Sequence, residues 1–535
     1  MKNNRVRLIA FVVIVALYAF LFACWMFHVP YNEAELFRAM PHNADMVSSH
    51  VDLPARFMRG ATIADNFGFL SPKVLEARKA MAASREFRKI FAAPELRTKR
   101  SVVGYIHRLD GEPACFFATW LGRHGQIMRW SLLWKTPPHL VRTSTDYGYP
   151  IWSSRSAASN DQVLSFAFVD GMLLGCISRN PAGVRHALET YDGHLPSVAA
   201  AKIPEYVAPL IPNPKAPDTG WFRTRTRPIP GMPHIVAFSF DSVEAPCIRG
   251  AFQSDMPLAA DSPLAAPVNL DGLENCFGKA PSAVLAMPSD LLAGALEAAP
   301  RSLPVEVASA LLHSGAVAQS GPVAAGLFLG EFGGRIHLAL GRPRIPALSL
   351  AVRLGDRDRV REGLTRAADL VNGVFRAGLI VSPAAILPGN TPFYGFEMTS
   401  SNSAAMQRPE DLPGCALAGN WLVLSSHAQS LQNVLSQTLT GSVTAAQTEA
   451  QPPEWQRLLR EKAAGAFFWA DLEATGKELD TLLVFSQMAG FFPRETPGVR
   501  AIIKKCRTFR TGAAWIELVN NRPRLCLEIG RPNAQ

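Results

Sequence analysis

Charged side chains are scarce in this chain. Asp, Glu, Lys and Arg together make up 18% of the 535 residues, whereas soluble proteins average about 25%. Hydrophobic residues account for 48%, a proportion that excludes a largely disordered chain. A chain of this length is too long for one compact core, so we expect two or three structural units.

The common catalytic motifs are also missing. The sequence contains no G-x-S-x-G nucleophile elbow, no P-loop, no H-E-x-x-H motif and no G-x-G-x-x-G fingerprint. No two histidines are spaced as a metal-binding pair, and no C-x-x-C spacing indicates zinc. We therefore expect no enzymatic activity, no cofactor, and neither a catalytic nor a metal site.

Cysteines are too irregularly placed to organise the fold. Beyond Cys24, seven remain, and an odd number cannot all pair. Cys506 and Cys526 flank a C-terminal hairpin and are the one pair that we consider as a disulfide. The others fall mostly in apolar segments, where a free cysteine behaves as a small hydrophobic residue.

Long apolar runs are limited to one, near the N-terminus. Residues 8–27, LIAFVVIVALYAFLFACWMF, carry no charge and would form a helix about 30 Å long, which matches a bilayer core. Lys2, Arg5 and Arg7 precede the run, and Glu33 is the first charge after it. This asymmetry predicts a cytoplasmic tail over residues 1–7, a single-pass anchor over 8–27, and a body outside the cytoplasm, in the periplasm.

Two other interpretations of this run stay open. A secretory signal would be cleaved, although its apolar region is normally only about 7–15 residues long. A lipoprotein signal would lead to lipidation of Cys24, which follows Ala23 in the sequence LFAC. All three interpretations place the body outside the cytoplasm, so we expect no nucleic-acid partner despite the net charge of +10.

Basic clusters are candidates for contact with anionic partners. Arg223, Arg225 and Arg227 alternate in WFRTRTRP and would share one face of an extended segment. Lys504 and Lys505 lie in the basic segment RAIIKKCRTFR. These residues favour contact with anionic lipid or glycolipid in the envelope.

Aromatic residues concentrate in FFATWLGRHGQIMRWSLLW. Trp130, Leu132 and Trp134 alternate, so we expect a strand with these three on one face. The segment is either ordinary core or an apolar surface for a lipid or a partner peptide, next to basic side chains. The candidate surface comprises Phe117, Trp120, Arg123, Arg129, Trp130 and Trp134.

One plan of elements occurs twice. FAFVDGMLLGCISRNPAGVRHALETYDG, from Phe166, reads as strand, turn, strand and helix, and CALAGNWLVLSSHAQSLQNVLSQTLTG, from Cys415, repeats it. Hairpins precede both copies. Apolar strands followed by an aspartate and a helix are expected at four places, with the carboxylate as the helix cap: Asp52, Asp241, Asp290 and Asp471.

This plan predicts an α+β protein with duplicated units of mainly antiparallel sheet and helices packed on one face. The expected units are residues 28–195 and 234–445, joined by a proline-rich connecting arm over 196–233. Residues 446–535 would form a partial third unit, a strand and helix followed by a closing hairpin.

The layout resembles that of uncharacterised single-pass bacterial envelope proteins with a duplicated α+β body. The resemblance covers most of residues 28–535 and rests on the order of the segments, so it implies location and fold but no catalytic residue. Our leading hypothesis is a non-enzymatic envelope scaffold or partner-binding module with protein partners. The alternatives are a lipid or glycolipid binding or transport protein, and an enzyme with an unrecognised site.

Overall fold

The computed structural model describes most of two compact units. It describes residues 11–21 except 19, 29–62, 94–109, 111–138, 140–154, 163–223, 234–242, 247–257, 281–298, 303–318, 321–328, 347–375, 378–387, 391–398, 414–425, 454–462, 465–477 and 509–530, with a few single positions between them. The units are Met1–Glu244 with Gly250–Met256, and Ala245–Arg249 with Pro257–Gln535. No helix within the described ranges is both long enough and apolar enough to cross a membrane.

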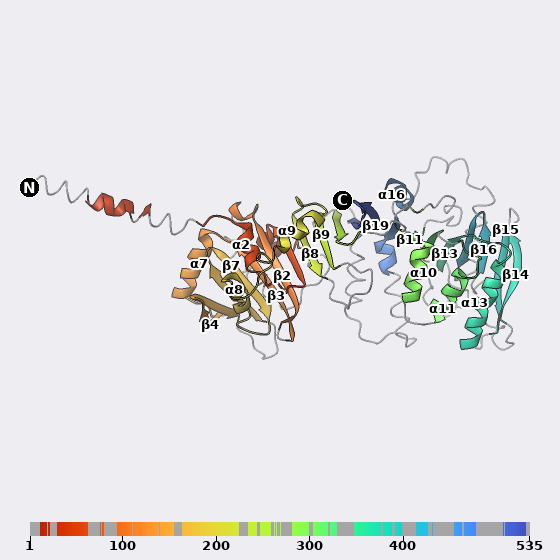
Figure 1. The fold of residues 1–535 in the computed structure, drawn as a ribbon, viewed down its shortest axis with the longest axis horizontal. Helices are drawn as coiled ribbons and strands as arrows, with labels where there is room; N and C mark the ends of the chain where they lie inside the picture. Colours follow the sequence, from red (N-terminus) through yellow and green to blue (C-terminus); the bar gives the residue numbers. More distant parts are fainter. Residues whose placement is uncertain are drawn as a thin grey trace, which may run out of the picture. The chain divides into compact units, whose positions relative to one another are not determined.

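The first unit is an antiparallel sheet with helices (Figure 1). Its hydrogen-bonded strand order is β9–β8–β1–β2–β3–β7–β6–β5–β4, and β10 pairs with β9. The elements are α2 (Glu33–Arg38), β1 (Met46–Val51), α3 (Leu53–Arg59), η1 (Pro94–Leu96), β2 (Arg100–Leu109), β3 (Glu112–Trp120), α7 (Arg123–Trp134), β4 (Leu140–Asp146), β5 (Tyr149–Ser154), β6 (Val163–Val169), β7 (Met172–Ser178), α8 (Arg185–Tyr191), α9 (Ile203–Val207), η2 (Ala208–Leu210), β8 (Asp218–Arg223), β9 (Ile235–Ser242) and β10 (Cys247–Ser254).

The second unit has the strand order β20–β19–β18–β11–β12–β13–β17–β16–β15–β14, also antiparallel throughout. From β19 to β14 this matches the order from β9 to β4, strand for strand. Its elements are β11 (Ala283–Pro288), α10 (Ser289–Ala298), α11 (Leu303–Leu312), β12 (Pro322–Phe328), β13 (Ala347–Arg353), α13 (Val360–Phe375), β14 (Leu379–Leu387), β15 (Thr391–Met398), β16 (Gly414–Ala418), β17 (Trp421–Ser425), α16 (Glu454–Lys462), β18 (Ala466–Asp471), β19 (Thr511–Val519) and β20 (Arg522–Gly530).

The predicted α+β class and antiparallel sheet are therefore confirmed, but the helices of the first unit lie on both faces. Ala167 and Val169 pack with Leu36 of α2 and Leu188 of α8. Phe166 and Phe168, which alternate with them on β6, pack instead with Met128 and Leu132 of α7. The prediction of helices on one face is wrong for this unit, because both faces of β6 are apolar and each needs a cover.

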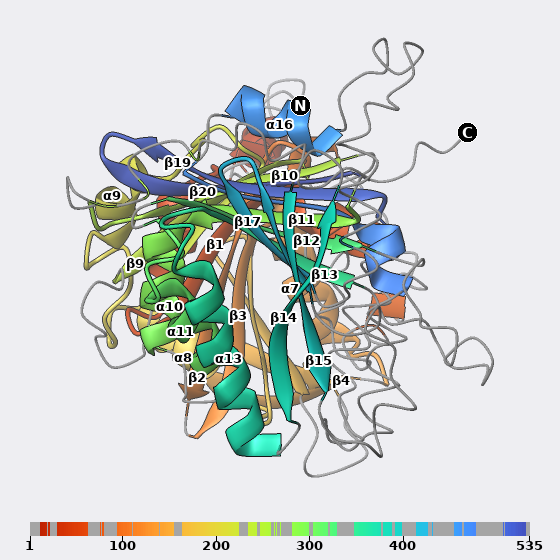
Figure 2. The same cartoon turned by 90° about the vertical axis from the view of Figure 1, so that its right-hand side faces the viewer.

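In the second unit, α10, α11 and α13 lie along one face of the sheet (Figure 2). Val360 and Leu364 of α13 are buried against Val352 and Leu422 of the sheet. The helix α13 follows β13 as α7 follows β3, so the two helices hold equivalent positions in the two chain orders.

Two of the expected segments have a different role in the structure. The proline-rich segment 196–233 contains β8, which lies between β1 and β9 in the first sheet. The segment 446–535 contains β18, which pairs with β11 and so belongs to the second sheet. The division into compact units falls at 244–257, later than the expected boundary at 233.

The turn of the C-terminal hairpin has residues suited to its backbone, whereas the predicted aspartate caps are found only in part. Asn520 and Asn521 both have positive φ between β19 and β20, as the hairpin requires. Asp471 accepts a hydrogen bond from the Ala474 backbone N–H and caps the helical turn after β18. The prediction of a helix cap is wrong at two positions. The Asp52 side chain makes no cap hydrogen bond, and Asp241 lies within β9. Asp290 is in the first turn of α10.

Candidate functional site

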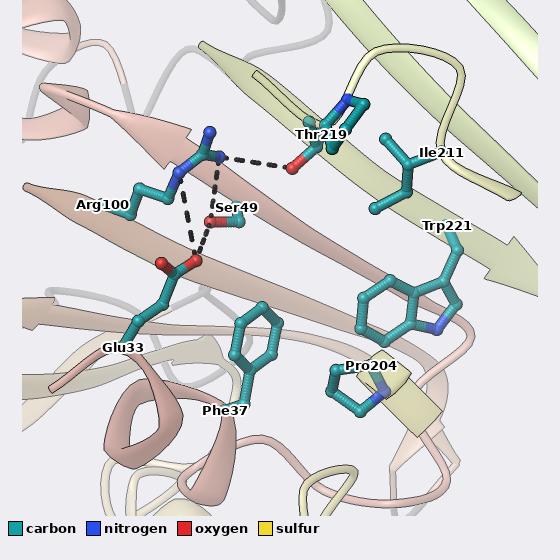
Figure 3. A pocket seen from close by; sticks show the side chains of 9 residues that line it. Glu33, Phe37, Ser49, Arg100, Pro204, Ile211, Thr219 and Trp221 are labelled. Carbon is teal, nitrogen blue, oxygen red and sulfur yellow. Dashed lines mark hydrogen bonds and ion pairs between the residues drawn. The ribbon is translucent and has the colours of Figure 1, made fainter. Parts of the chain in front are cut away.

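A cavity of about 230 Å³ opens in the first unit between α2 and β8 (Figure 3). One wall is apolar, and there the rings of Phe37 and Trp221 stack with their centroids 6.0 Å apart. The other wall is polar and carries Glu33 and Arg100. The full lining is Glu33, Phe37, Ser49, Arg100, Pro204, Ile211, Pro214, Thr219 and Trp221.

The polar groups of this cavity mostly bind one another. Ser49 Oγ donates to Glu33 Oε1 at 3.3 Å. The Arg100 guanidinium donates to Ser49 Oγ at 3.4 Å, to Thr219 Oγ1 at 3.3 Å and to the Ala216 carbonyl at 2.8 Å. Because this wall is internally hydrogen-bonded and the volume is below the roughly 300–1,000 Å³ of typical ligand pockets, the cavity fits a structural role better than ligand capture.

On the opposite face of β1, three side chains form a chain of hydrogen bonds. Ser48 Oγ lies 2.8 Å from His50 Nε2, and His50 Nδ1 lies 2.7 Å from Asp218 Oδ1. Sequence reasoning missed this group, because Asp218 is distant in sequence and reaches β1 only through the β1–β8 pairing. The order of atoms is that of a Ser–His–Asp catalytic triad.

Burial argues against catalysis by this group. Ser48 is only 2% exposed and faces Val103 and Gly220 on the two flanking strands, so its hydroxyl has no open approach for a substrate. Asp218 is fully buried, and Arg56 donates to both of its carboxylate oxygens, at 2.7 and 2.8 Å. A carboxylate shared with a guanidinium is a poor partner for an imidazolium, so this cluster ties α3 to β1 and β8.

The electrostatics of Asp218 fit that structural role. Burial alone would raise the pKa of the carboxyl group, but hydrogen bonds and charge from His50 and Arg56 lower it, and the net pKa lies below the usual 3.8. Asp218 therefore stays ionised in the fold and is neutralised by its partners.

The second part of the aromatic segment, Arg123–Trp134, forms the helix α7 and not the expected strand. Gly122 precedes α7 with φ +55°, and Lys135 leaves it in an extended conformation just before Thr136, Pro137 and Pro138. The Thr136 hydroxyl donates to the Leu132 carbonyl at 2.9 Å and satisfies one free acceptor of the last turn. Prolines beyond this point cannot continue a helix.

The helix exposes a continuous apolar stripe on its outer face. Ile127 and Trp130 are each 51% exposed, Leu133 is 36% exposed and Trp134 is 87% exposed. The candidate surface predicted from sequence included the two tryptophans but not Ile127 and Leu133. The helical spacing of residues 127, 130 and 134 could have identified the stripe. Arg123 lies one turn before Ile127, and Arg129 places its guanidinium 5.5 Å from the Tyr149 ring.

Phe117 and Trp120, the other aromatic candidates, lie on β3 and are partly buried. Phe117 on β3 is half-buried and covers Gly175, where an added Cβ would enter its ring. Trp120, at the end of β3, contacts the Tyr31 ring edge-on at 5.8 Å. The structure thus brings the aromatic residues into one region, with only Trp130 and Trp134 largely exposed.

The basic clusters and cysteines are only partly within the described residues. Arg223 donates to the His42 carbonyl at 3.0 Å, so it binds its own unit. Cys526 is a free thiol that lies 3.4 Å from Glu517, and burial raises its pKa to about 12. The remaining candidates lie outside the described residues: Cys24, Arg225, Arg227, Lys504, Lys505 and Cys506.

No family model, curated protein or solved structure matches this chain. Among the residues that the structure describes, no group of three or more His, Cys, Asp or Glu side chains is placed to hold a metal ion. The most distinctive surface feature in the described ranges is the exposed stripe of α7.

Proposed function

We propose that this protein is a single-pass, membrane-anchored protein of the cell envelope with a periplasmic body that acts as a non-enzymatic scaffold or partner-binding module. One observation carries the membrane part. The described positions between residues 11 and 21 are helical, and every large apolar side chain among them is exposed, from 49% at Val15 to 71% at Tyr18. Exposing so many apolar side chains to water is unfavourable, whereas the hydrocarbon core of a bilayer accommodates them.

The charge pattern supports the orientation of this anchor. Residues 8–27 are uncharged, and Lys2, Arg5 and Arg7 precede them, whereas the first basic residue after them is Arg38. Trp25 and Tyr31 lie near the C-terminal end of the run in the sequence, where interfacial aromatics are favoured. We infer that residues 1–7 are cytoplasmic and that both units lie on the other side of the membrane.

The matching strand orders of the two units support internal duplication of the body. A duplicated α+β body behind one anchor is also the layout of the envelope proteins that this sequence resembles. The burial of Ser48 weakens the enzyme alternative.

Binding of a lipid or glycolipid is the second candidate function. The observation that favours it is the exposed stripe of α7, where Trp130 and Trp134 lie beside the basic residues Arg123 and Lys135. An amphiphile with an anionic head group would match both properties.

Membrane extraction tests the proposed function. The full-length chain is expected to stay in the membrane pellet through alkaline carbonate washing, and a variant without residues 8–27 is expected in the soluble fraction. Intact-mass measurement of the extracted protein then separates a retained anchor from a cleaved signal and from a chain lipidated at Cys24. A full-length chain that carbonate releases would contradict the anchor.

Identification of co-purifying molecules tests the scaffold role. The full-length protein is extracted in mild detergent, and bound proteins and lipids are identified by mass spectrometry. A stoichiometric protein partner supports the scaffold, whereas a bound lipid without a protein partner favours the second candidate. Turnover of a substrate by the purified protein would contradict both.

A further inference from the structure

The helix α7 is apolar on two opposite sides. Its inner side packs Met128 and Leu132 into the core, with Trp152 and Phe166 of the sheet. Its outer side carries the stripe of Ile127, Trp130, Leu133 and Trp134, which is exposed on the first unit. A surface helix normally presents polar residues outward, so this outer side is suited to a second apolar surface.

Val29, which closely follows the apolar run, lies beside the start of α7. Val29, two residues after the run ends, packs so closely on Gly171 that a Cβ at Gly171 would lie 2.5 Å from Val29 Cγ1. Gly171 in turn touches α7, because its carbonyl oxygen would lie 2.8 Å from a Cβ at Gly125. If residues 8–27 span the bilayer, the first turn of α7 lies close to the membrane surface.

Tyr31 and Trp120 hold this junction in place. Their rings meet edge-on at 5.8 Å, and the Lys99 ammonium lies 4.7 Å from the Tyr31 ring and 5.9 Å from the Trp120 ring. The Tyr31 hydroxyl also accepts a hydrogen bond from the Arg100 backbone N–H at 3.2 Å. Because Trp120 is the last residue of β3 and α7 starts at Arg123, Tyr31 is held close to the start of the helix.

The charge along α7 and the segments that flank it in sequence suits an anionic bilayer. Between Glu112 and Asp146 the sequence contains no acidic residue but carries Arg123, Arg129, Lys135 and Arg142. Lys and Arg side chains near an anionic membrane surface are attracted to it. Tryptophan prefers the head-group region, where its ring is buried and its N–H stays hydrated.

We propose that α7 lies on the surface of the same bilayer that holds residues 8–27, with the stripe of Ile127, Trp130, Leu133 and Trp134 inserted among the lipid head groups. This inference rests on the proposed anchor and deepens it, because it names the partner of α7 as anionic phospholipid. The first unit is then held to the membrane at two places, and its orientation is fixed.

Site-specific photocrosslinking of the full-length chain tests this proposal. The protein is reconstituted in vesicles of phosphatidylcholine and phosphatidylglycerol, with p-benzoyl-phenylalanine in place of Trp134. The matched control carries the same group in place of Tyr206, an exposed aromatic residue of α9 that is 57% exposed. Figure 1 shows α9 at the other side of the first unit from α7. Irradiation is expected to give several-fold more lipid adduct at position 134 than at position 206.

The outcomes separate the two proposals. Vesicle flotation first shows whether the chain is anchored, and a chain that does not float with the vesicles contradicts the anchor and this inference together. A chain that floats but gives equal lipid adducts at the two positions overturns the inference and leaves the anchor standing. Adducts at position 134 to a second copy of the chain, without lipid, would show that α7 is a dimer interface and would also overturn it.

Discussion

Asp218 holds three elements of the first unit together. It is fully buried and takes hydrogen bonds from Arg56 on α3 and His50 on β1. Replacing Asp218 with Ala leaves a buried guanidinium without its partner, so we expect the first unit to lose about 3–5 kcal/mol of stability. Hydrogen exchange in peptides covering β1 and β8 measures the loss.

A surface ion pair provides the control. Arg179 and Glu112 approach to 2.6 Å, but both side chains are about half exposed. Glu112→Gln is therefore expected to change stability by about 1 kcal/mol or less. Equal effects of the two substitutions would show that burial does not strengthen the Asp218 pair.

The same carboxylate predicts a pH dependence. The folded-state pKa of Asp218 is lower than its ordinary value of 3.8, so the ionised group stabilises the fold above that pH. This contribution is lost as the pH falls through the folded-state pKa. We expect the protection of β1 against hydrogen exchange, corrected for the intrinsic rate at each pH, to fall below about pH 4 more steeply in the wild type than in Asp218→Asn. Parallel pH profiles for the two proteins would contradict this assignment.

At the scale of one element, α7 depends on a glycine contact. A Cβ at Gly125 would meet the Gly171 carbonyl oxygen at 2.8 Å, and backbone cannot move aside as a flexible side chain can. Gly125→Ala is expected to destabilise the docking of α7 by about 1–3 kcal/mol, measured as faster hydrogen exchange in this helix.

Gly294 in α10 is the matched helical glycine. A Cβ there meets no atom within 4 Å, so alanine gains helix propensity without a clash. Gly294→Ala is expected to stabilise its helix by up to about 1 kcal/mol. The two glycine substitutions should therefore have opposite signs, and destabilisation by both would disprove the contact argument.

The elements also show what could be predicted from sequence. Local turn residues and alternating apolar residues identified hairpins such as β19–β20, because their partners are adjacent in the chain. The same signals did not identify β8. This proline-rich segment forms a strand through its pairing with β1, which is distant in sequence. The sequence of α7 is compatible with two structures. The alternation of Trp130, Leu132 and Trp134 fits a strand, whereas the spacing of residues 127, 130 and 134 fits a helix. Packing against Trp152 and Phe166 decides for the helix.

At the scale of the whole molecule, the two compact units predict local responses to core mutations. Leu364 is 1% exposed on α13, and Leu364→Ala should cost about 2–5 kcal/mol. For Leu364→Ala we expect faster hydrogen exchange in β12, β13 and β17 and unchanged exchange in β1 to β3. For Asp218→Ala we expect faster exchange in β1 to β3 and unchanged exchange in β12, β13 and β17. Faster exchange across both units in either variant would indicate that the units unfold as one.

The position of β1 has a consequence for how the chain is made. This early strand lies between β2, which follows soon after it, and β8, which begins only at Asp218. Likewise, β11 lies between β12 and the late strand β18. During synthesis, each unit therefore carries an open sheet edge until its late strand has emerged, and such edges favour wrong pairing. A chain interrupted before residue 218 lacks β8, the strand that pairs with the free edge of β1, so we expect chaperones and proteases to recognise such truncated products.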